Sequence, residues 1–207
     1  MIGLSGSHRT GKTTLAKMYA EMNGIDFVQT DSAGVFARMG LDPREDYPFA
    51  VRLDIQREIL NDAALLYISN KHQHGFITDR TPLDMLAYTT ADVQRSNLTA
   101  EDSEAFMKYQ KECFDITNRH FVLVMVVQPG IPLVEARGKA PAIEAYMEHI
   151  NSLVMGLSVD PRMKTGRFYI GRDNIAMSRR INAMDYAWQR VEDSHTRDFQ
   201  EAGGIAH

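Results

Sequence analysis

The stretch that decides the fold is GSHRTGKT, from Gly6 to Thr13. It matches the phosphate-loop pattern G-x-x-x-x-G-K-[ST]. It lies between a short apolar segment, Ile2 to Ser5, and a segment of helical periodicity that begins at Lys12. A strand, a glycine-rich turn and a helix N-terminus in this order direct backbone N–H groups toward a phosphate. The sequence therefore predicts a P-loop that opens a nucleotide-binding α/β domain.

Individual residues of the loop have separate expected roles toward ATP. Gly6 and Gly11 allow the backbone angles that the turn needs, because glycine has no Cβ. Lys12 is expected to reach the β- and γ-phosphates as a catalytic cation, and the Thr13 hydroxyl is expected to ligate Mg²⁺. The other candidate nucleotide contacts are His8, Arg9, Thr10 and Thr14. For His8 and Arg9, an ordinary solvated loop position is an equal alternative.

Composition bounds the class of protein. A chain of 207 residues with 44% hydrophobic and 24% charged residues is expected to form one domain, residues 1–207. The mean hydropathy is -0.31 and no apolar stretch approaches a membrane span, so we expect no membrane partner. The single cysteine, Cys113, and an N-terminus without a basic leader favour a cytoplasmic location. A net charge of -4 argues against a broad surface for long nucleic acid and leaves room for a local basic patch.

Short apolar segments alternate with longer segments of helical period. Strands are expected at residues 1–5, 26–30, 75–78, 120–128 and 167–171, and helices at 12–22, 48–69, 99–117, 140–157 and from 174. The pattern predicts a five-stranded parallel sheet with helices on both faces. The fourth strand is apolar throughout and should be covered on both sides. On the first helix, the expected buried stripe is Leu15, Met18, Tyr19 and Met22.

A second acidic motif separates the P-loop classes. The segment Gly75 to Arg80 reads as a strand that ends in Asp79-Arg80, which would place Asp79 beside the P-loop as a second metal ligand. ATPases of the AAA type carry a glutamate directly after this aspartate to activate water, whereas Arg80 stands here. Hydrolysis is therefore disfavoured as the main reaction. The guanine motif N-K-x-D of GTPases is not matched by the nearest segment, residues 70–73.

On the P-loop and the segment Asp79 to Asp84, the chain resembles the P-loop nucleoside and nucleotide kinases related to thymidylate and deoxynucleoside kinases. The resemblance implies an adenylate kinase-like P-loop NTPase fold and a cytoplasmic enzyme. It also implies transfer of the γ-phosphate of ATP, with Mg²⁺, to a nucleoside, a nucleoside monophosphate or a related small acceptor. It implies metal binding by Asp79 and substrate or phosphate binding by Arg80. A helix cap and a surface arginine are the alternative interpretation of this pair.

The resemblance also suggests residues on the acceptor and lid sides. Asp31, at the end of the second strand, would be the catalytic base, with a helix N-cap as an equal alternative. Phe36, Arg38, Arg44 and Arg52 lie in the segment that would wall the acceptor pocket. Residues 129–142 would form a short lid that carries Arg137 as a catalytic cation, together with Lys139, with Arg162, Lys164 and Arg167 as rivals. Arg172 would contact the adenine.

Two alternatives and one assembly state stay open at this point. A kinase of this size, as some phages encode, could instead phosphorylate hydroxymethylated uracil in DNA, using a short groove around Arg162, Lys164, Arg167 and Arg172. The chain could also be a non-catalytic ATP-binding regulatory module, although retention of Lys12, Thr13 and Asp79 argues for chemistry. A homodimer is possible.

Overall fold

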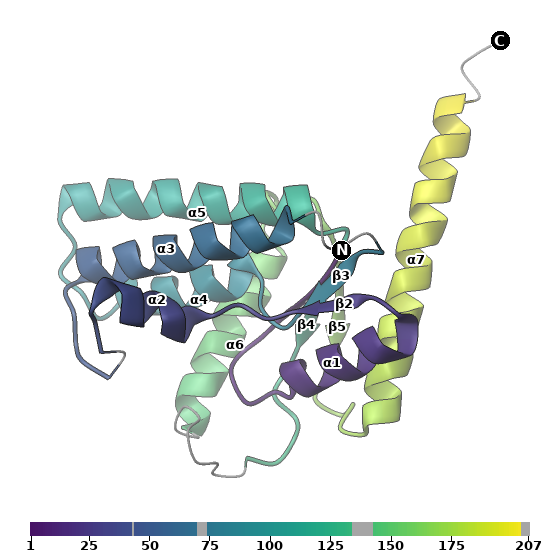
Figure 1. Ribbon diagram of the computed structural model, residues 1–207, viewed down its shortest axis with the longest axis horizontal. Coiled ribbons are helices and arrows are strands. Elements are labelled where there is room, and N and C mark those ends of the chain that lie inside the picture. Colours follow the sequence, from purple (N-terminus) through teal and green to yellow (C-terminus); the bar gives the residue numbers. More distant parts are fainter. Residues whose placement is uncertain (43, 70–73, 134–142, 204–207) are drawn as a thin grey trace.

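The computed structural model describes residues 1–42, 44–69, 74–133 and 143–203, and the side chains of these residues as far as Ser194. Its sheet has five parallel strands in the order β2-β3-β1-β4-β5 (Figure 1). The strands are β1 (Ile2–Ser5), β2 (Asp26–Val28), β3 (Phe76–Thr78), β4 (Leu123–Val127) and β5 (Gly166–Ile170). The predicted five-stranded parallel α/β fold is confirmed, and each strand lies within two or three residues of its expected position.

Helices cover both faces of this sheet. They are α1 (Lys12–Asn23), α2 (Ser32–Met39), α3 (Phe49–Tyr67), α4 (Pro82–Val93), α5 (Ala100–His120), α6 (Glu144–Ser158) and α7 (Met177–Gly203). Helices α1 and α7 lie on one side, and α2 to α6 lie on the other (Figure 1). None of the helices in the described part of the chain combines the length and apolar composition that crossing a membrane requires.

The interior strand β4, between β1 and β5, contributes to both hydrophobic cores. Leu123, Met125 and Val127 pack in the cluster that α1 and α7 cover, whereas Val124 and Val126 pack in the cluster on the opposite face. All five side chains are fully buried. The prediction that this strand is covered on both sides is confirmed, because successive side chains of a strand point to opposite faces.

The predicted stripe on α1 is half wrong. Leu15 and Tyr19 are buried, but Met18 and Met22 are 39% and 62% exposed. The buried positions between them are Ala16 and Ala20. Small side chains allow the helix backbone to approach the sheet closely, so the inward face is centred on alanines and the flexible methionines lie at its margin.

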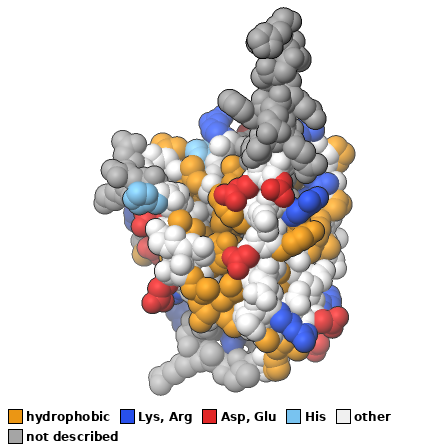
Figure 2. Space-filling model, turned by 90° about the vertical axis from the view of Figure 1, so that its right-hand side faces the viewer, with side chains coloured by type: hydrophobic (Ala, Val, Ile, Leu, Met, Phe, Trp, Pro, Cys, Tyr) orange, Lys and Arg blue, Asp and Glu red, His pale blue; other side chains and the backbone are white. Residues whose placement is uncertain are grey.

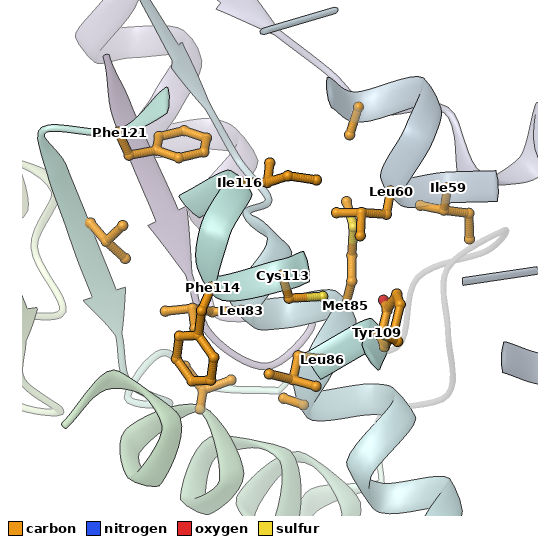
Figure 3. Packing of buried hydrophobic residues seen from close by; sticks show 14 of the residues in the cluster. Ile59, Leu60, Leu83, Met85, Leu86, Tyr109, Cys113, Phe114, Ile116 and Phe121 are labelled. Atoms are coloured by element: carbon orange, nitrogen blue, oxygen red, sulfur yellow. The ribbon is translucent and has the colours of Figure 1, made fainter. Parts of the chain in front are cut away.

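Helix α4 was not predicted, because it lacks the amphipathic pattern of a surface helix. It is buried on nearly every side, so its sequence, PLDMLAYTTADV, lacks the solvent-facing charged stripe of a surface helix. Figure 3 shows Met85 and Leu86 of this helix beside Tyr109 and Cys113 of α5. Burial raises the pKa of the Cys113 thiol well above its ordinary value, which keeps it protonated within this core.

The outer surface on the side of α7 carries hydrophobic side chains together with both acidic and basic ones (Figure 2). Of the predicted lid, residues 129–133 follow β4 without forming a helix or strand. The rest of it, with Arg137 and Lys139, lies outside the described residues.

Candidate active site

The P-loop connects the end of β1 to the start of α1. Gly6 and Gly11 have φ angles of 146° and 81°, and Arg9 has a φ of 63°. A Cβ at Gly6 would lie 2.3 Å from the carbonyl oxygen of Val127, so only glycine fits between the loop and β4. The loop bounds a pocket of about 270 Å³. The residues that line this pocket are His8, Arg9, Thr10, Gly11, Lys12, Thr13, Thr14, Asp79 and Arg80. Nearly all the predicted phosphate and metal candidates thus meet in one place.

The Lys12 side chain folds back on its own loop. Its Nζ donates hydrogen bonds to the carbonyl oxygens of Gly6 and Ser7, both at 2.7 Å. Burial lowers the pKa of Lys12 to about 8; the carboxylates of Asp84 and Asp79 raise it, and Arg80 lowers it further. A lysine whose charge is poorly solvated favours an incoming anion, because the phosphate restores the stabilisation that burial removed.

Thr13 and Asp79 come together at the mouth of the pocket. The Thr13 hydroxyl donates a hydrogen bond to the Asp79 carboxylate, which is 7% exposed. A hydroxyl and a carboxylate are hard oxygen ligands of the kind that Mg²⁺ prefers, so these residues fit the ion. No group of three or more His, Cys, Asp and Glu in the described chain is arranged to hold a metal. Two protein oxygens suit Mg²⁺, which usually completes its shell with water and substrate phosphates.

Asp84 is a residue of the site whose role the sequence did not reveal. It is 1% exposed and accepts hydrogen bonds from the backbone N–H of Gly6 at 2.7 Å and of Thr81 at 2.9 Å. Burial raises its pKa, and the nearby charge of Lys12 opposes that effect. Asp84 therefore anchors the P-loop to the first turn of α4. The spacing Thr81-Pro82-Leu83-Asp84, a capping box with proline at N1, is the signal that could have identified it.

An aromatic wall adjoins the P-loop. The hydroxyl of Tyr88 accepts a hydrogen bond from the backbone N–H of His8 at 3.1 Å, and the Arg80 guanidinium lies 5.9 Å from the Tyr88 ring centre. The ring of Tyr146, from α6, lies 6.4 Å from that of Tyr88. Burial raises the pKa of Tyr88 to about 12, so the phenol is neutral at physiological pH. Neither tyrosine was predicted as a site residue.

A second pocket lies at the C-terminal end of α4. Asp84, Tyr88 and Asp92 are spaced four residues apart and share one side of α4. Asp92 pairs with Arg52, at 3.2 Å, and with Arg95. Asp92, Arg52 and Arg95, with Tyr47 and Phe49, border a pocket of about 540 Å³, whereas Asp84 and Tyr88 do not line it.

None of the acceptor-side candidates lines the phosphate pocket. Arg52 borders the second pocket, whereas Arg38 pairs with Asp62 and Arg44 pairs with Asp42. Asp31 is the N-cap of α2: its carboxylate accepts the N–H of Gly34 at 2.9 Å, and the residue is exposed. The cap is therefore observed, and the base role stays a prediction.

The candidates in the second half of the chain are not gathered in the phosphate pocket. Arg172 forms two hydrogen bonds with Glu148 of α6, at 2.5 and 2.6 Å, and its side chain is 49% exposed. Arg162 pairs with Asp160 at 2.8 Å. Arg137, the predicted lid cation, is outside the described residues. Contacts of Arg172 or Arg137 with a nucleotide stay predictions.

Fold and site together define a P-loop nucleotide-binding domain of the kinase-like α/β type. Residues 1–122, which span β1 to α5, match the family model described as an AAA domain, and the chain belongs to this family. A search of curated protein sequences found no match.

Solved structures resemble the chain over most of its length. A deoxyadenosine kinase from M. mycoides has a TM-score of 0.65 at 14% identity and covers 91% of this chain and 98% of that one. The NadR protein, in complex with NAD and AMP-PNP, has a TM-score of 0.64 at 16% identity, over 90% of this chain and 48% of that one. The YorR protein from Bacillus subtilis has a TM-score of 0.55 at 12% identity, over 94% and 97% of the two chains. At such identities the likeness shows the fold.

Proposed function

We propose that the protein is an ATP- and Mg²⁺-dependent kinase that transfers the γ-phosphate to a nucleoside, a nucleoside monophosphate or a related small acceptor. The observation that carries the proposal is the contact of Thr13 with Asp79 in the pocket that also contains Lys12. Arg80 follows Asp79, at the position where an AAA-type ATPase has its glutamate for activating water. The metal-binding and phosphate-binding groups are thus present without the hydrolytic base.

Each residue of the pocket has a proposed task. The backbone N–H groups of the P-loop and the N-terminus of α1 bind the phosphate chain. Lys12 exchanges its two bonds to the loop carbonyls for bonds to phosphate oxygens. Thr13 and Asp79 would hold Mg²⁺, whose positive charge would offset the negative charge of the phosphates. Arg80, whose guanidinium lies near the Tyr88 ring, would stabilise the transferring group, and Arg137 would do so from the lid.

The acceptor is proposed to lie along α4. From Asp84 to Asp92 the helix rises by about 12 Å, since each residue adds about 1.5 Å. That span suits a molecule of nucleoside size whose hydroxyl is at the P-loop and whose polar end is near Arg52 and Asp92. Tyr88 and Tyr146 provide an aromatic wall between the two ends. Asp31 is proposed to accept the proton of the attacking hydroxyl.

The relatives support this class of acceptor. The deoxyadenosine kinase was solved with dCMP and dCDP as products and, separately, with dATP and with dCTP. The YorR protein was solved with phosphorylated GDP. DNA is a weaker candidate, because two arginines of the predicted basic groove, Arg162 and Arg172, already pair with Asp160 and Glu148.

The test measures ADP formation from ATP and Mg²⁺ with a panel of nucleosides and nucleotides, and with hydroxymethyluracil DNA at low salt. We expect ADP that depends on one small acceptor and is lost in Lys12→Ala. The matched control is Lys17→Ala, an exposed lysine one turn further along α1. ADP formation independent of any acceptor would instead indicate an ATPase. Tight ATP binding without turnover on any acceptor would indicate a regulatory module.

A further inference from the structure

Arg180 of α7 is a buried arginine that fastens the P-loop to another part of the chain. It is 1% exposed. Its Nε donates to the carbonyl oxygen of Asn174 at 2.6 Å, and its Nη1 donates to the carbonyl oxygen of Thr10 at 2.7 Å. Its Nη2 is buried and has no hydrogen-bond partner among the described residues. The side chain thus connects the turn after β5 to the middle of the P-loop.

Within the described part of the chain, no carboxylate pairs with the charge of Arg180. Arg44, Arg162 and Arg172, which are more exposed, each pair with an acidic side chain. Arg180 forms no ion pair with the described residues, and burial is the one cause that shifts its pKa, which it lowers. A buried cation that only carbonyl groups solvate destabilises a protein, and an anion nearby relieves that cost. The nearest place built for an anion is the P-loop.

A single peptide group of the P-loop connects the Arg180 guanidinium to the phosphate pocket. The Thr10–Gly11 peptide is trans, so the Thr10 carbonyl and the Gly11 N–H point in opposite directions. A cation bound to the carbonyl polarises the peptide and strengthens the N–H as a donor on the far side. Gly11 lines the phosphate pocket. A Cβ at Gly11 would lie 3.0 Å from Nη1 of Arg180, so the guanidinium packs closely against this peptide.

We infer that Arg180 is a positioning residue for the phosphates of the bound nucleotide, acting through the Thr10–Gly11 peptide without touching the ligand. Its charge strengthens phosphate binding at the P-loop and is tolerated in the ligand-free protein at the expense of stability. The inference rests on the triphosphate site of the proposed function and does not require phosphoryl transfer. If Arg180 instead only holds the turn at Asn174, its replacement should leave the binding of ligands that consist of phosphate alone nearly unchanged.

The experiment compares the affinities of the full chain for ATP and for inorganic tripolyphosphate. Arg180→Met keeps the apolar length and removes the charge, and Arg179→Met removes the charge of its exposed neighbour as the matched control. We expect Arg180→Met to weaken both ligands at least tenfold and Arg179→Met to change neither more than twofold. The thermal midpoint of ligand-free Arg180→Met should equal or exceed that of the wild type, because a buried charge is gone.

Several outcomes would overturn the inference. Tripolyphosphate binding within threefold of the wild type in Arg180→Met, or a loss confined to ATP, would show that Arg180 serves only the turn after β5. If Arg180→Met does not fold, Arg180→Lys and Arg180→Gln take its place, because both side chains retain a hydrogen-bond donor and only lysine retains the charge. The inference then requires Arg180→Lys to bind ATP and tripolyphosphate more tightly than Arg180→Gln. A wild type that binds both ligands but transfers no phosphate would contradict the proposed function alone. A wild type that binds neither would contradict both proposals.

Discussion

The hydroxyl of Thr13 donates a hydrogen bond to the carboxylate of Asp79, although 66 positions separate the two residues in the chain. Their proximity follows from the order of the sheet, in which β1 and β3 are parallel neighbours. The P-loop leaves the carboxyl end of β1, and Asp79 follows the carboxyl end of β3. The two motifs that a metal–nucleotide site needs therefore meet at the same edge.

Replacing either member of this pair should impair catalysis. Thr13→Val and Asp79→Asn each remove one expected ligand of Mg²⁺ and should lower the rate of transfer by about 100-fold, on the order of 3 kcal/mol. The rates are measured over a series of Mg²⁺ concentrations. Because both residues serve one ion, the double variant should lose little more than the worse single one. Fully additive losses would show that the two residues act separately.

Nucleotide affinity should fall at alkaline pH. The pKa of Lys12 is lowered to about 8, below its ordinary value, so the folded protein loses this proton first. Between about pH 8 and the ordinary lysine pKa the unfolded chain binds more protons, and the free energy of unfolding of the ligand-free protein rises with pH from this source. Phosphate binding needs the charged form, so the dissociation constant for ATP should increase by roughly tenfold per pH unit above about 8. Titration calorimetry from pH 7 to pH 9.5 measures this dissociation constant. A constant affinity over that range would contradict phosphate binding by Lys12.

The two roles of Asp31 can be separated by a single substitution. Asparagine is as good an N-cap as aspartate, so Asp31→Asn should retain the bond to Gly34 and the stability of α2. If Asp31 is the base, turnover should nevertheless fall by about 100-fold or more while ATP affinity stays within twofold. Asp31→Ala should lose both turnover and about 1 kcal/mol of stability. Unchanged turnover in Asp31→Asn would leave Asp31 as a cap only.

Asp84 should matter for stability as well as for binding. Asp84→Asn replaces an acceptor of two backbone N–H groups by an amide that can accept through only one atom, so one buried donor loses its partner. We expect a loss of about 1–3 kcal/mol in the free energy of unfolding, together with weaker ATP binding.

The chain provides a matched control for this substitution. Thr99 and Asp102 form the same capping box at the start of α5, with its hydrogen bonds exposed to solvent. Asp102→Asn should cost less than half as much, because water can satisfy the freed groups. Chemical denaturation of both variants gives the comparison. Equal losses would mean that the buried contact of Asp84 with Gly6 adds nothing.

Local patterns in the sequence were sufficient to predict the P-loop, the β–α alternation and the position of Asp79 beside the P-loop. Each depends on residues that are close in the chain: a glycine spacing, a run of apolar side chains, or a strand that ends in an acid. The start of a helix near residue 99 and the end of the first helix near residue 22 were predicted for the same reason, and the capping box at Thr99 and the φ of 63° at Gly24 mark these boundaries in the structure. The stripe on α1 was half wrong because periodicity does not say which of two neighbouring faces packs on the sheet.

Only the tertiary structure decided the partners of the P-loop. The bond from Gly6 to Asp84 spans 78 positions, and the bond from Arg180 to Thr10 spans 170. Neither residue has a recognisable role by itself: Asp84 reads as part of a helix cap, and Arg180 reads as one charge on a long amphipathic helix. The order of the strands and the burial of α4 bring Asp84 and Arg180 into contact with the P-loop. The sequence by itself predicted a phosphate-binding turn and gave its position in the chain. The packing of α4 and α7 decided which buried charges hold that turn in place, because burial and long-range contact are properties of the folded chain.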